Sequence, residues 1–542
     1  MRGSFFGLNI SVSGLLAAQR NLDVVNHNIN NVNTPGYSRQ EGLQRAENPI
    51  PLLDGTGMVG TGSRIYAVKR IRDEYLDYKF WSESKSVGEM EAKMIGLADI
   101  EAYLNEPSDA GYNKIMDKFY DGLQELSKDP GNDAIRALVR ENGVTLAKYF
   151  NSTAAHLEKL QADLNDKIKS KAEEVNTLAK RIRELNKQIY TFEVDGSAAN
   201  DLRDQRTVLV DKLSKLVNVE AYEVTVGKLC NGADNKHFVV TISGKALVDH
   251  YDVSPIKVEK RANKLNEEDI DGLYELSWAD GNMLTIRGGE IKGYFDVRDG
   301  NDGQDVDTGY TGPFYKSPNY EGVPYYQRKL NEFVREFARV FNEGRDSNSD
   351  GDFNDAGDIK GHVLGYGLDP DGSGALAQTS GMRFFTRLDG TTQTAMSSTA
   401  FTTAQYANLT AKNFCVSKDV MENPRYIATA DATGQIENTN ILKSLIDTKH
   451  FKSMFLEGEP GDFMKSLVVS VGVNTQYAET IAKNQSAIIE HIENKRLSIS
   501  GVSLDEEMSN MVKFQQAYNA SARMIVTMGE VYDTLINRLG VR

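Results

Sequence analysis

The sequence predicts an α+β multidomain protein, in which long coiled-coil-like terminal helices and a helical-bundle shaft surround an inserted β-rich domain. Three observations lead to this fold class. Apolar residues repeat every seven positions near both chain ends, a longer repeat of the same period runs through residues 157–189, and alternating runs typical of strands begin near residue 221. At 542 residues the chain is also too long for one hydrophobic core.

The first predicted helix covers residues 8–32. Its apolar residues fall in two rows with a seven-residue period, the pattern of an a/d seam. Polar residues lie between the rows, and Pro35 and Gly36 are expected to stop the helix. The rows consist of Leu8, Leu15, Leu22 and Ile29, and of Ala18, Val25 and Val32.

The last predicted helix covers residues 504–535 and has a similar seam, with Ser521 as a polar interruption. Each terminal helix lies too near a chain end to share a core with its sequence neighbours. We therefore expect the two to pack with each other and with further copies of the chain. The alternative is an ordinary pair of core helices. The predicted assembly interface consists of Leu8, Leu15, Leu22, Val25, Ile29, Val32, Met511, Phe514, Tyr518, Ile525, Met528, Tyr532 and Leu535.

Helical periodicity also dominates from about residue 70 to residue 192, with breaks near residues 105 and 130. The strongest stretch predicts a long rod-like helix in an antiparallel bundle, with Lys171 at one seam position. Its apolar rows consist of Leu157, Leu164, Leu178 and Leu185, and of Ile168, Val175, Ile182 and Ile189.

Strands are predicted at residues 237–242 and 283–286, and helices at residues 326–342 and 463–497. This order predicts three domains, with both chain ends at the same end of the molecule. They are a terminal assembly domain (1–47 and 503–542), a helical shaft (48–220 and 439–502) and an inserted β-rich outer domain (221–438). The helix at residues 326–342 is assigned either to the insertion or to the shaft.

Composition excludes several classes of partner. The net charge of −15 and the absence of a basic patch argue against nucleic acid, and the lack of a long apolar run argues against membrane insertion. Cys230 and Cys415 are expected to be incidental thiols rather than a disulfide. The heptad pattern continues past Ala17 and Ala18, so we read the N-terminus as retained structure and expect no cleaved signal peptide.

No catalytic motif emerges, and we do not expect an enzyme. Residues 55–60 match G-x-G-x-x-G, but no strand precedes them and no helix follows, so a flexible turn is the better interpretation. The seven histidines are scattered without metal-ligand spacing, and no other cofactor is predicted apart from one candidate metal.

That candidate is a calcium loop after the helix at residues 326–342, which fits D-x-[DN]-x-[DN]-G. The twelfth position is Gly357 rather than a bidentate glutamate, so Asp355 or Asp358 would have to complete a structural site. An acidic turn without metal is the alternative. The candidate ligands are Asp346, Asn348, Asp350, Asp352 and Asn354.

Two terminal stretches resemble known proteins. Residues 11–19 and 28–40, the latter with Asn-Thr-Pro-Gly-Tyr-Ser-Arg-Gln at its end, are similar to the N-terminal signature of bacterial flagellar axial proteins. Residues 500–507, Ser-Gly-Val-Ser-Leu-Asp-Glu-Glu, and the Phe-Gln-Gln-Ala-Tyr of 514–518 are similar to their C-terminal signature. The family includes rod, hook and hook-associated proteins. The exact residues of these motifs and the long internal helices most resemble the hook-associated proteins of the hook–filament junction.

The resemblance implies a structural, non-catalytic role at the hook–filament junction, needed for filament assembly. Implied partners are further copies of the chain in a ring or helical tube, the hook protein, a second hook–filament junction protein and a flagellar export chaperone. It also implies secretion through the flagellar type III apparatus. Two alternatives stay open: a hook or distal rod protein, and a calcium-dependent surface adhesin whose ligand binds residues 221–440. Hook proteins are mainly β outside their terminal helices, so the long internal repeat argues against the first.

Overall fold

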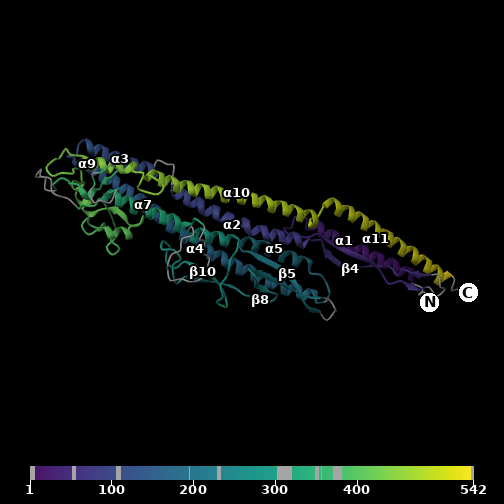
Figure 1. Cartoon of the computed structure of the whole chain (residues 1–542). Helices are drawn as coiled ribbons and strands as arrows, with labels where there is room; N and C mark the ends of the chain where they lie inside the picture. The colour runs from purple at the N-terminus through teal and green to yellow at the C-terminus, as the bar shows by residue number, and fades with distance from the viewer. Residues whose placement is uncertain are drawn as a thin grey trace.

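The computed structural model describes residues 6–51, 57–104, 111–194, 196–228, 234–301, 320–347, 353, 355, 357–369 and 381–538. The molecule is elongated, and both chain ends lie at the same end of it (Figure 1). Long helices run along the shaft, and small antiparallel sheets lie beside it or at its ends. The predicted α+β multidomain fold class is confirmed.

The helices and the strands are numbered separately, each in chain order. The helices are α1 (Phe6–Asn30), α2 (Glu74–Leu104), α3 (Tyr112–Lys128), α4 (Asp133–Glu193), α5 (Asn200–Leu216), α6 (Glu290–Asp299), α7 (Val323–Glu343), α8 (Lys418–Glu422), α9 (Asn440–Asp447), α10 (Pro460–Ser500) and α11 (Leu504–Asp533). The strands are β1 (Gln40–Ala46), β2 (Ile50–Pro51), β3 (Met58–Val59), β4 (Ser63–Arg70), β5 (Val219–Lys228), β6 (Asp234–Ile242), β7 (Lys245–Asp249), β8 (Asp252–Val253), β9 (Ile256–Lys260), β10 (Tyr274–Trp278), β11 (Gly344–Arg345), β12 (Ile359–Lys360), β13 (Phe385–Arg387) and β14 (Phe414–Val416).

The 61-residue helix α4 is the spine of the shaft and is about 90 Å long at 1.5 Å per residue. It starts where Asn132 caps it, because the Asn132 side chain accepts hydrogen bonds from the backbone N–H groups of Ala134 and Ile135. Lys171, the polar residue in the predicted seam, is half-buried and pairs with Glu290 of α6 at 3.0 Å. The predicted row Ile168, Val175, Ile182 and Ile189 is fully buried.

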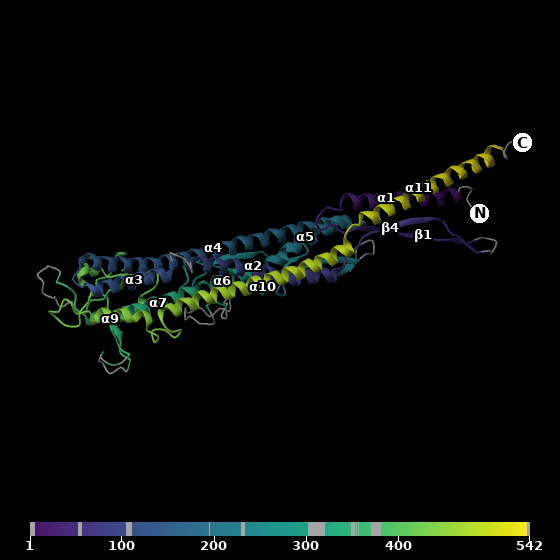
Figure 2. The same ribbon diagram turned by 90° about the horizontal axis from the view of Figure 1, so that it is seen from above.

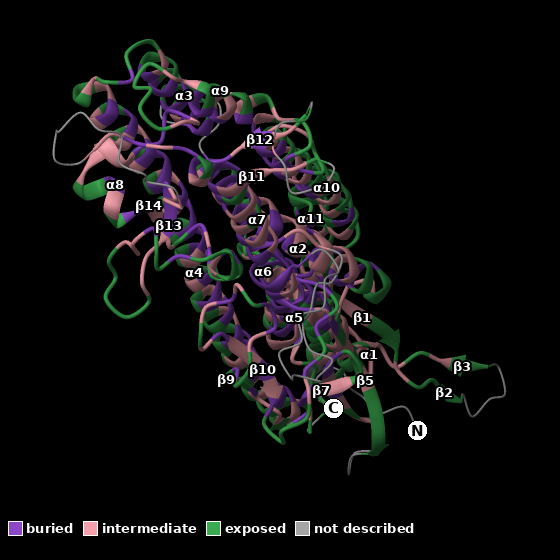
Figure 3. Ribbon diagram, turned by 60° about the vertical axis from the view of Figure 1, so that its left-hand side comes forward, coloured by how far each residue is buried: buried purple, intermediate pink, exposed green. Residues whose placement is uncertain are grey.

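Helices α2 and α10 run side by side along the shaft (Figures 1 and 2). Their buried residues face inwards and their exposed residues face solvent (Figure 3). At the end of the shaft that holds the chain termini, α1 lies between α11 and the long hairpin of β1 and β4.

A four-stranded antiparallel meander, in the order β5-β6-β7-β8, packs beside α4 and α5, and the β9–β10 hairpin lies next to it along α4. The strand predicted at residues 283–286 is wrong. Met283 makes only an isolated bridge with Ser277, and the following residues have no strand pairing. Leu284 and Ile286 are buried, so the alternation reflects side chains of a loop that face the core.

The opposite end of the molecule contains α3, α9 and the short strands β11 to β14 (Figure 3). Helix α7 starts beside α6, with Pro324 in its first turn, runs towards this end and packs an aromatic face into the core. Phe333 stacks on Phe150 of α4 with ring centroids 5.1 Å apart. The residues predicted on one side of this helix, Leu330, Phe333, Phe337, Val340 and Phe341, are all completely buried.

His362 at this end is completely buried and predicts a pH-dependent stability. Its Nδ1 donates to the Met382 carbonyl (2.8 Å), and its Nε2 accepts from the Ala428 backbone N–H (2.9 Å), an arrangement that requires the neutral ring. Burial lowers the pKa of His362 to about 4. Between pH 6.5 and 4 the unfolded chain therefore binds a proton that the folded chain does not, so stability falls as the pH falls through this window. The loss is about 3 kcal/mol at pH 4.

Urea unfolding at pH 7 and pH 4.5 measures this effect. We expect His362→Gln to reduce the loss of stability on acidification relative to the unaltered chain. His450→Gln is the matched control, because the His450 side chain is 71% exposed. Identical pH dependence in His362→Gln and the unaltered chain would show that His362 is not responsible.

Candidate assembly interface

Helices α1 and α11 pack antiparallel along most of their lengths (Figure 2). Their register is visible at three levels. Gly7 lies against Met528, Gly14 lies against Ser521, and the Asn28 amide donates to the Glu507 carboxylate at 3.1 Å. The seven-residue period therefore does set the pairing of the two helices, and the polar interruption Ser521 is located opposite a glycine.

The predicted N-terminal seam is only partly buried in this pairing. Val25 is buried, whereas Leu8, Leu15, Leu22, Ile29 and Val32 are half-buried. The reason is that α1 has a second neighbour, since its Ser13 hydroxyl accepts from the Ser63 N–H of β4. The buried positions of α1 are Ala17, Ala18, Asn21, Val25 and Asn28.

The predicted C-terminal seam faces α1 along part of its length. Among the described residues of α11, Glu507 alone is buried. Met511 and Leu535 are exposed, at 37% and 55%. The half-buried seam residues are Phe514, Tyr518, Ile525, Met528 and Tyr532.

The other side of α11 is an uncovered apolar face. Val512 and Val526 are 54% and 62% exposed. A helix with so little buried area gains little stability from its own chain, because helices depend on tertiary packing for most of their stability. Further exposed apolar residues of α11 are Leu504, Met508, Met524 and Val531.

Gly14 allows the close approach of the two helices. A Cβ at this position would lie 3.2 Å from the Ser521 hydroxyl. We expect Gly14→Val to separate α1 from α11 and to destabilise the pair by about 1–3 kcal/mol, despite the usual gain on replacing a helical glycine. Hydrogen exchange of the α11 amides measures this. Gly529→Ala is the control, because a Cβ there has no neighbour among the described residues and should stabilise α11; equal exchange in both variants would contradict close packing at Gly14.

A set of polar residues joins the terminal helices to the shaft, and we call it the polar joint. Asn28 is its centre on α1 and is 1% exposed. Its amide oxygen accepts from the Gln40 N–H (2.9 Å) and the Tyr37 hydroxyl (2.8 Å). Arg39 pairs with Glu507 at 2.8 Å, so the segment after α1 is tied to the start of α11. The joint consists of Asn28, Ser38, Arg39, Arg70, Arg72, Asp77, Asp204, Arg496 and Glu507.

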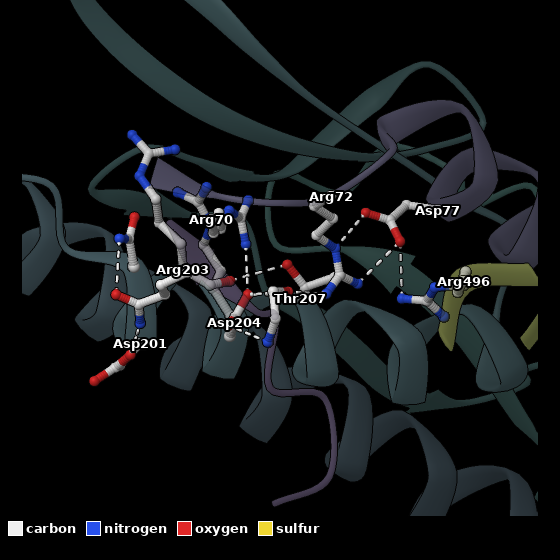
Figure 4. Close-up of polar contacts among 12 residues, drawn as sticks. Arg70, Arg72, Asp77, Asp201, Arg203, Asp204, Thr207 and Arg496 are labelled. Carbon is white, nitrogen blue, oxygen red and sulfur yellow. Dashed lines mark hydrogen bonds and ion pairs between the residues drawn. The ribbon is translucent and has the colours of Figure 1, made fainter. Parts of the chain in front are cut away.

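On the shaft side, Asp204 of α5 accepts three hydrogen bonds (Figure 4). They come from the Ser38 N–H, the Ser38 hydroxyl and Arg70, each at 2.8 Å. Asp204 is 3% exposed, so its charge depends on these partners.

Arg72 and Arg496 complete the joint by converging on Asp77 (Figure 4). Arg72 makes a two-pronged pair with Asp77 (2.7 and 2.9 Å), and Arg496 of α10 adds a third contact at 2.8 Å. Burial lowers the pKa of Arg72, but hydrogen bonding and charge interactions with Asp77 outweigh it and hold this pKa above the ordinary value. The joint therefore connects β4, α2, α5, α10 and α11 through ionised side chains, and α1 through the Asn28 amide.

The turn at residues 34–37 has a steric reason for its glycine. Gly36 has a φ of +77°, and a Cβ there would clash with the Val208 side chain of α5. The helix before this turn ends at Asn30 rather than at Val32. Beside it, burial and then Asp201 and Asp204 raise the pKa of Tyr37, which keeps its hydroxyl protonated as a donor to Asn28.

Sequence reasoning missed the polar joint, although four of its residues lie in the segments recognised as signatures: Asn28, Ser38, Arg39 and Glu507. The sequence motifs of these segments were the only signal that could have pointed to the joint. A search for apolar seams does not mark a buried asparagine or glutamate. Asp204, the partner of Ser38, also lies far from it in the sequence.

The candidate calcium loop is mostly outside the described residues. Asp346 is described, whereas Asn348, Asp350, Asp352 and Asn354 are not. Asp358, one proposed completing ligand, accepts from the Ser347 N–H (2.8 Å) and hydroxyl (2.6 Å), and these bonds lower the pKa of its carboxyl. Within the described part of the chain, no cluster of metal-ligating side chains is present. The calcium site stays a prediction.

Two further features concern the cysteines and the hydropathy of the helices. Cys415 is a free thiol whose pKa burial raises to about 11, and Cys230 is outside the described residues. Among the helices described, none combines the length and apolar character that a membrane span requires.

Comparison with family models finds three matches. The flagellar hook-associated protein FlgK helical domain matches residues 97–359, the flagellar basal body rod FlgEFG protein C-terminal region matches residues 493–539, and the flagella basal body rod protein matches residues 8–37. The last two cover most of α1 and α11, and the first covers α3 to α7, including the whole of α4.

Curated relatives match along the whole chain. Flagellar hook-associated protein 1 of Bacillus subtilis is 28% identical, with 100% of this chain and 99% of the relative covered. The protein of the same name from Escherichia coli is 25% identical, with 98% and 99% covered. Among solved structures, the flagellar hook junction protein FlgK from Burkholderia pseudomallei aligns with a TM-score of 0.53 at 12% identity, over 79% of this chain and 100% of that one, and so shares the fold.

Proposed function

Because this chain belongs to the flagellar hook-associated protein 1 family, we propose that it is a structural component of the bacterial flagellum that forms the junction between hook and filament and is required for filament assembly. The observation that supports this most directly is the antiparallel α1–α11 pair. The pair is formed by the first and the last long helix, one side of α11 is uncovered and apolar, and the polar joint fixes the pair to the shaft. Such a module buries its apolar face when neighbouring copies pack around it.

The first partner is a second copy of the chain, in a ring or helical tube. The hook protein binds on one side of this ring and a second hook–filament junction protein on the other. A flagellar export chaperone covers α11 before assembly, since exposed Met508, Val512 and Val526 would otherwise aggregate. The protein reaches the flagellum through the flagellar type III apparatus.

The role is mechanical rather than catalytic. Charged residues of the polar joint, Asp204 and Arg72 among them, are engaged in bonds that hold helices together. Such residues do not offer a free acid, base or nucleophile to a substrate.

Deletion of residues 505–542 tests the proposal. We expect a soluble, folded monomer, because the shaft core contains no residue of α11. Cells that express it should build hooks without filaments and release unpolymerised flagellin into the medium. The full-length chain expressed from the same plasmid is the control. Normal swimming by the deletion strain would overturn the junction role.

A further inference from the structure

A cavity of 360 Å³ lies between the end of α4, the start of α5 and the β5–β6 hairpin. It belongs to neither the polar joint nor the α1–α11 pair, although α5 is common to this cavity and the joint. Its walls include Asn186 and Tyr190 of α4, Arg206 of α5, Asn235 of β6 and His250 in the turn between β7 and β8.

Three of these side chains have buried polar atoms without a hydrogen-bond partner among the described residues. Arg206 is 4% exposed; its two terminal nitrogens bind Asn186 and Glu223, but its Nε–H has no acceptor. His250 is 5% exposed, and neither of its ring nitrogens is bonded. The Asn235 amide oxygen is the third unpaired group.

The position of His250 is fixed by its surroundings. Its backbone φ of +48° belongs to the tight turn between β7 and β8, and its ring stacks on His237 with centroids 4.0 Å apart. Burial lowers the pKa of His250 to about 4, so the ring is neutral near pH 7 and offers one donor and one acceptor.

The charges of the walls are balanced. Arg203 pairs with Glu193 (2.7 Å) and Glu223 (2.6 Å), and Lys236 also lies 3.7 Å from Glu223. With Arg206 and Asp234, the cavity has three cationic and three anionic side chains. A charged ligand would add an uncompensated charge to this cavity, whereas a neutral ligand would not.

We infer that this cavity binds a neutral polyhydroxyl ligand of monosaccharide size. A hydroxyl group both donates and accepts, so neighbouring hydroxyls match the unpaired Arg206 donor, the Asn235 acceptor and the mixed imidazole of His250. The Tyr190 ring adds an apolar wall, as is usual in small-molecule sites with a few placed polar groups.

Saturation-transfer NMR on the full chain tests the inference, with glucose and N-acetylglucosamine as probes and inorganic phosphate as a charged comparison. We expect saturable binding of one of the sugars with a Kd of about 1–10 mM. Asn235→Ala and His250→Asn should each weaken it by about tenfold, because each removes a hydrogen-bonding group. Asparagine tolerates the positive φ at position 250, so the second variant is expected to fold.

Thr225→Ala is the matched control. Thr225 is exposed on β5 and does not line the cavity, so this variant should bind as the unaltered chain does. Absence of saturation transfer from both sugars, equal binding in Asn235→Ala and the unaltered chain, or binding of phosphate alone would each overturn the inference. The proposed junction function does not depend on this result.

Discussion

Val512→Glu is expected to abolish assembly while the monomer stays folded. Val512 is 54% exposed on the side of α11 that faces away from α1, so the carboxylate stays in water as long as the chain is alone. If a neighbouring copy covers this face, the carboxylate must be desolvated at a cost of about 3 kcal/mol or more, which weakens each contact by about 100-fold. Glutamate also favours helices more than valine does, so α11 itself is not penalised.

Sedimentation of the purified chain and swimming of the corresponding cells measure the effect. Val512→Leu is the matched control, because leucine is apolar like valine and favours helices about as much as glutamate does. This variant should assemble normally. The same design applies to Val526, which is 62% exposed. Normal assembly of both glutamate variants would mean that this face of α11 stays in solvent in the flagellum.

Asp204→Asn is expected to loosen the polar joint and to destabilise it by about 3 kcal/mol, because the change leaves the half-buried Arg70 without its counter-charge. The asparagine also replaces one acceptor oxygen with an N–H₂ group next to the Ser38 donors. Faster hydrogen exchange is expected in the segment after α1 and at the start of α11. Thermal unfolding provides the second measurement.

Asp201→Asn, one turn earlier on α5, is the control. Its side chain is 52% exposed and binds His27 and Gln40 at the surface, so we expect a loss of less than about 1 kcal/mol. Figure 4 shows both aspartates on the same helix. If the two variants lose the same stability, burial of Asp204 does not determine the strength of the joint.

The shaft was largely predictable because its helices obey local periodicity. Helix α4 contains the predicted rows and starts just after the predicted break near residue 130, so seven-residue spacing and a helix breaker were enough. Even Lys171 fits once Glu290 is known to lie beside it, although no local pattern pairs residues so far apart.

The candidate site was predictable only in part. Heptads located the two terminal helices, but Asn28 and Glu507 meet across 479 residues of chain, and local sequence patterns do not reveal such contacts. The rows were also incomplete as a guide to burial, because the β1–β4 hairpin covers α1 from a second side and shifts the buried positions towards Ala17 and Asn21. The strand predicted at residues 283–286 is wrong for a related reason. Alternating apolar residues indicate which side chains are buried, but they do not show that the backbone pairs with another strand.

The pairing of the first and last long helices, α1 and α11, has a practical consequence for imaging and display. A fluorescent protein or affinity tag fused to either end would be placed where subunits are proposed to pack. The exposed turn at Gly390 and Thr391, after β13 near the opposite end of the molecule, has free space around its glycine. An epitope inserted there would leave the terminal helices unaltered and label the protein from its far end.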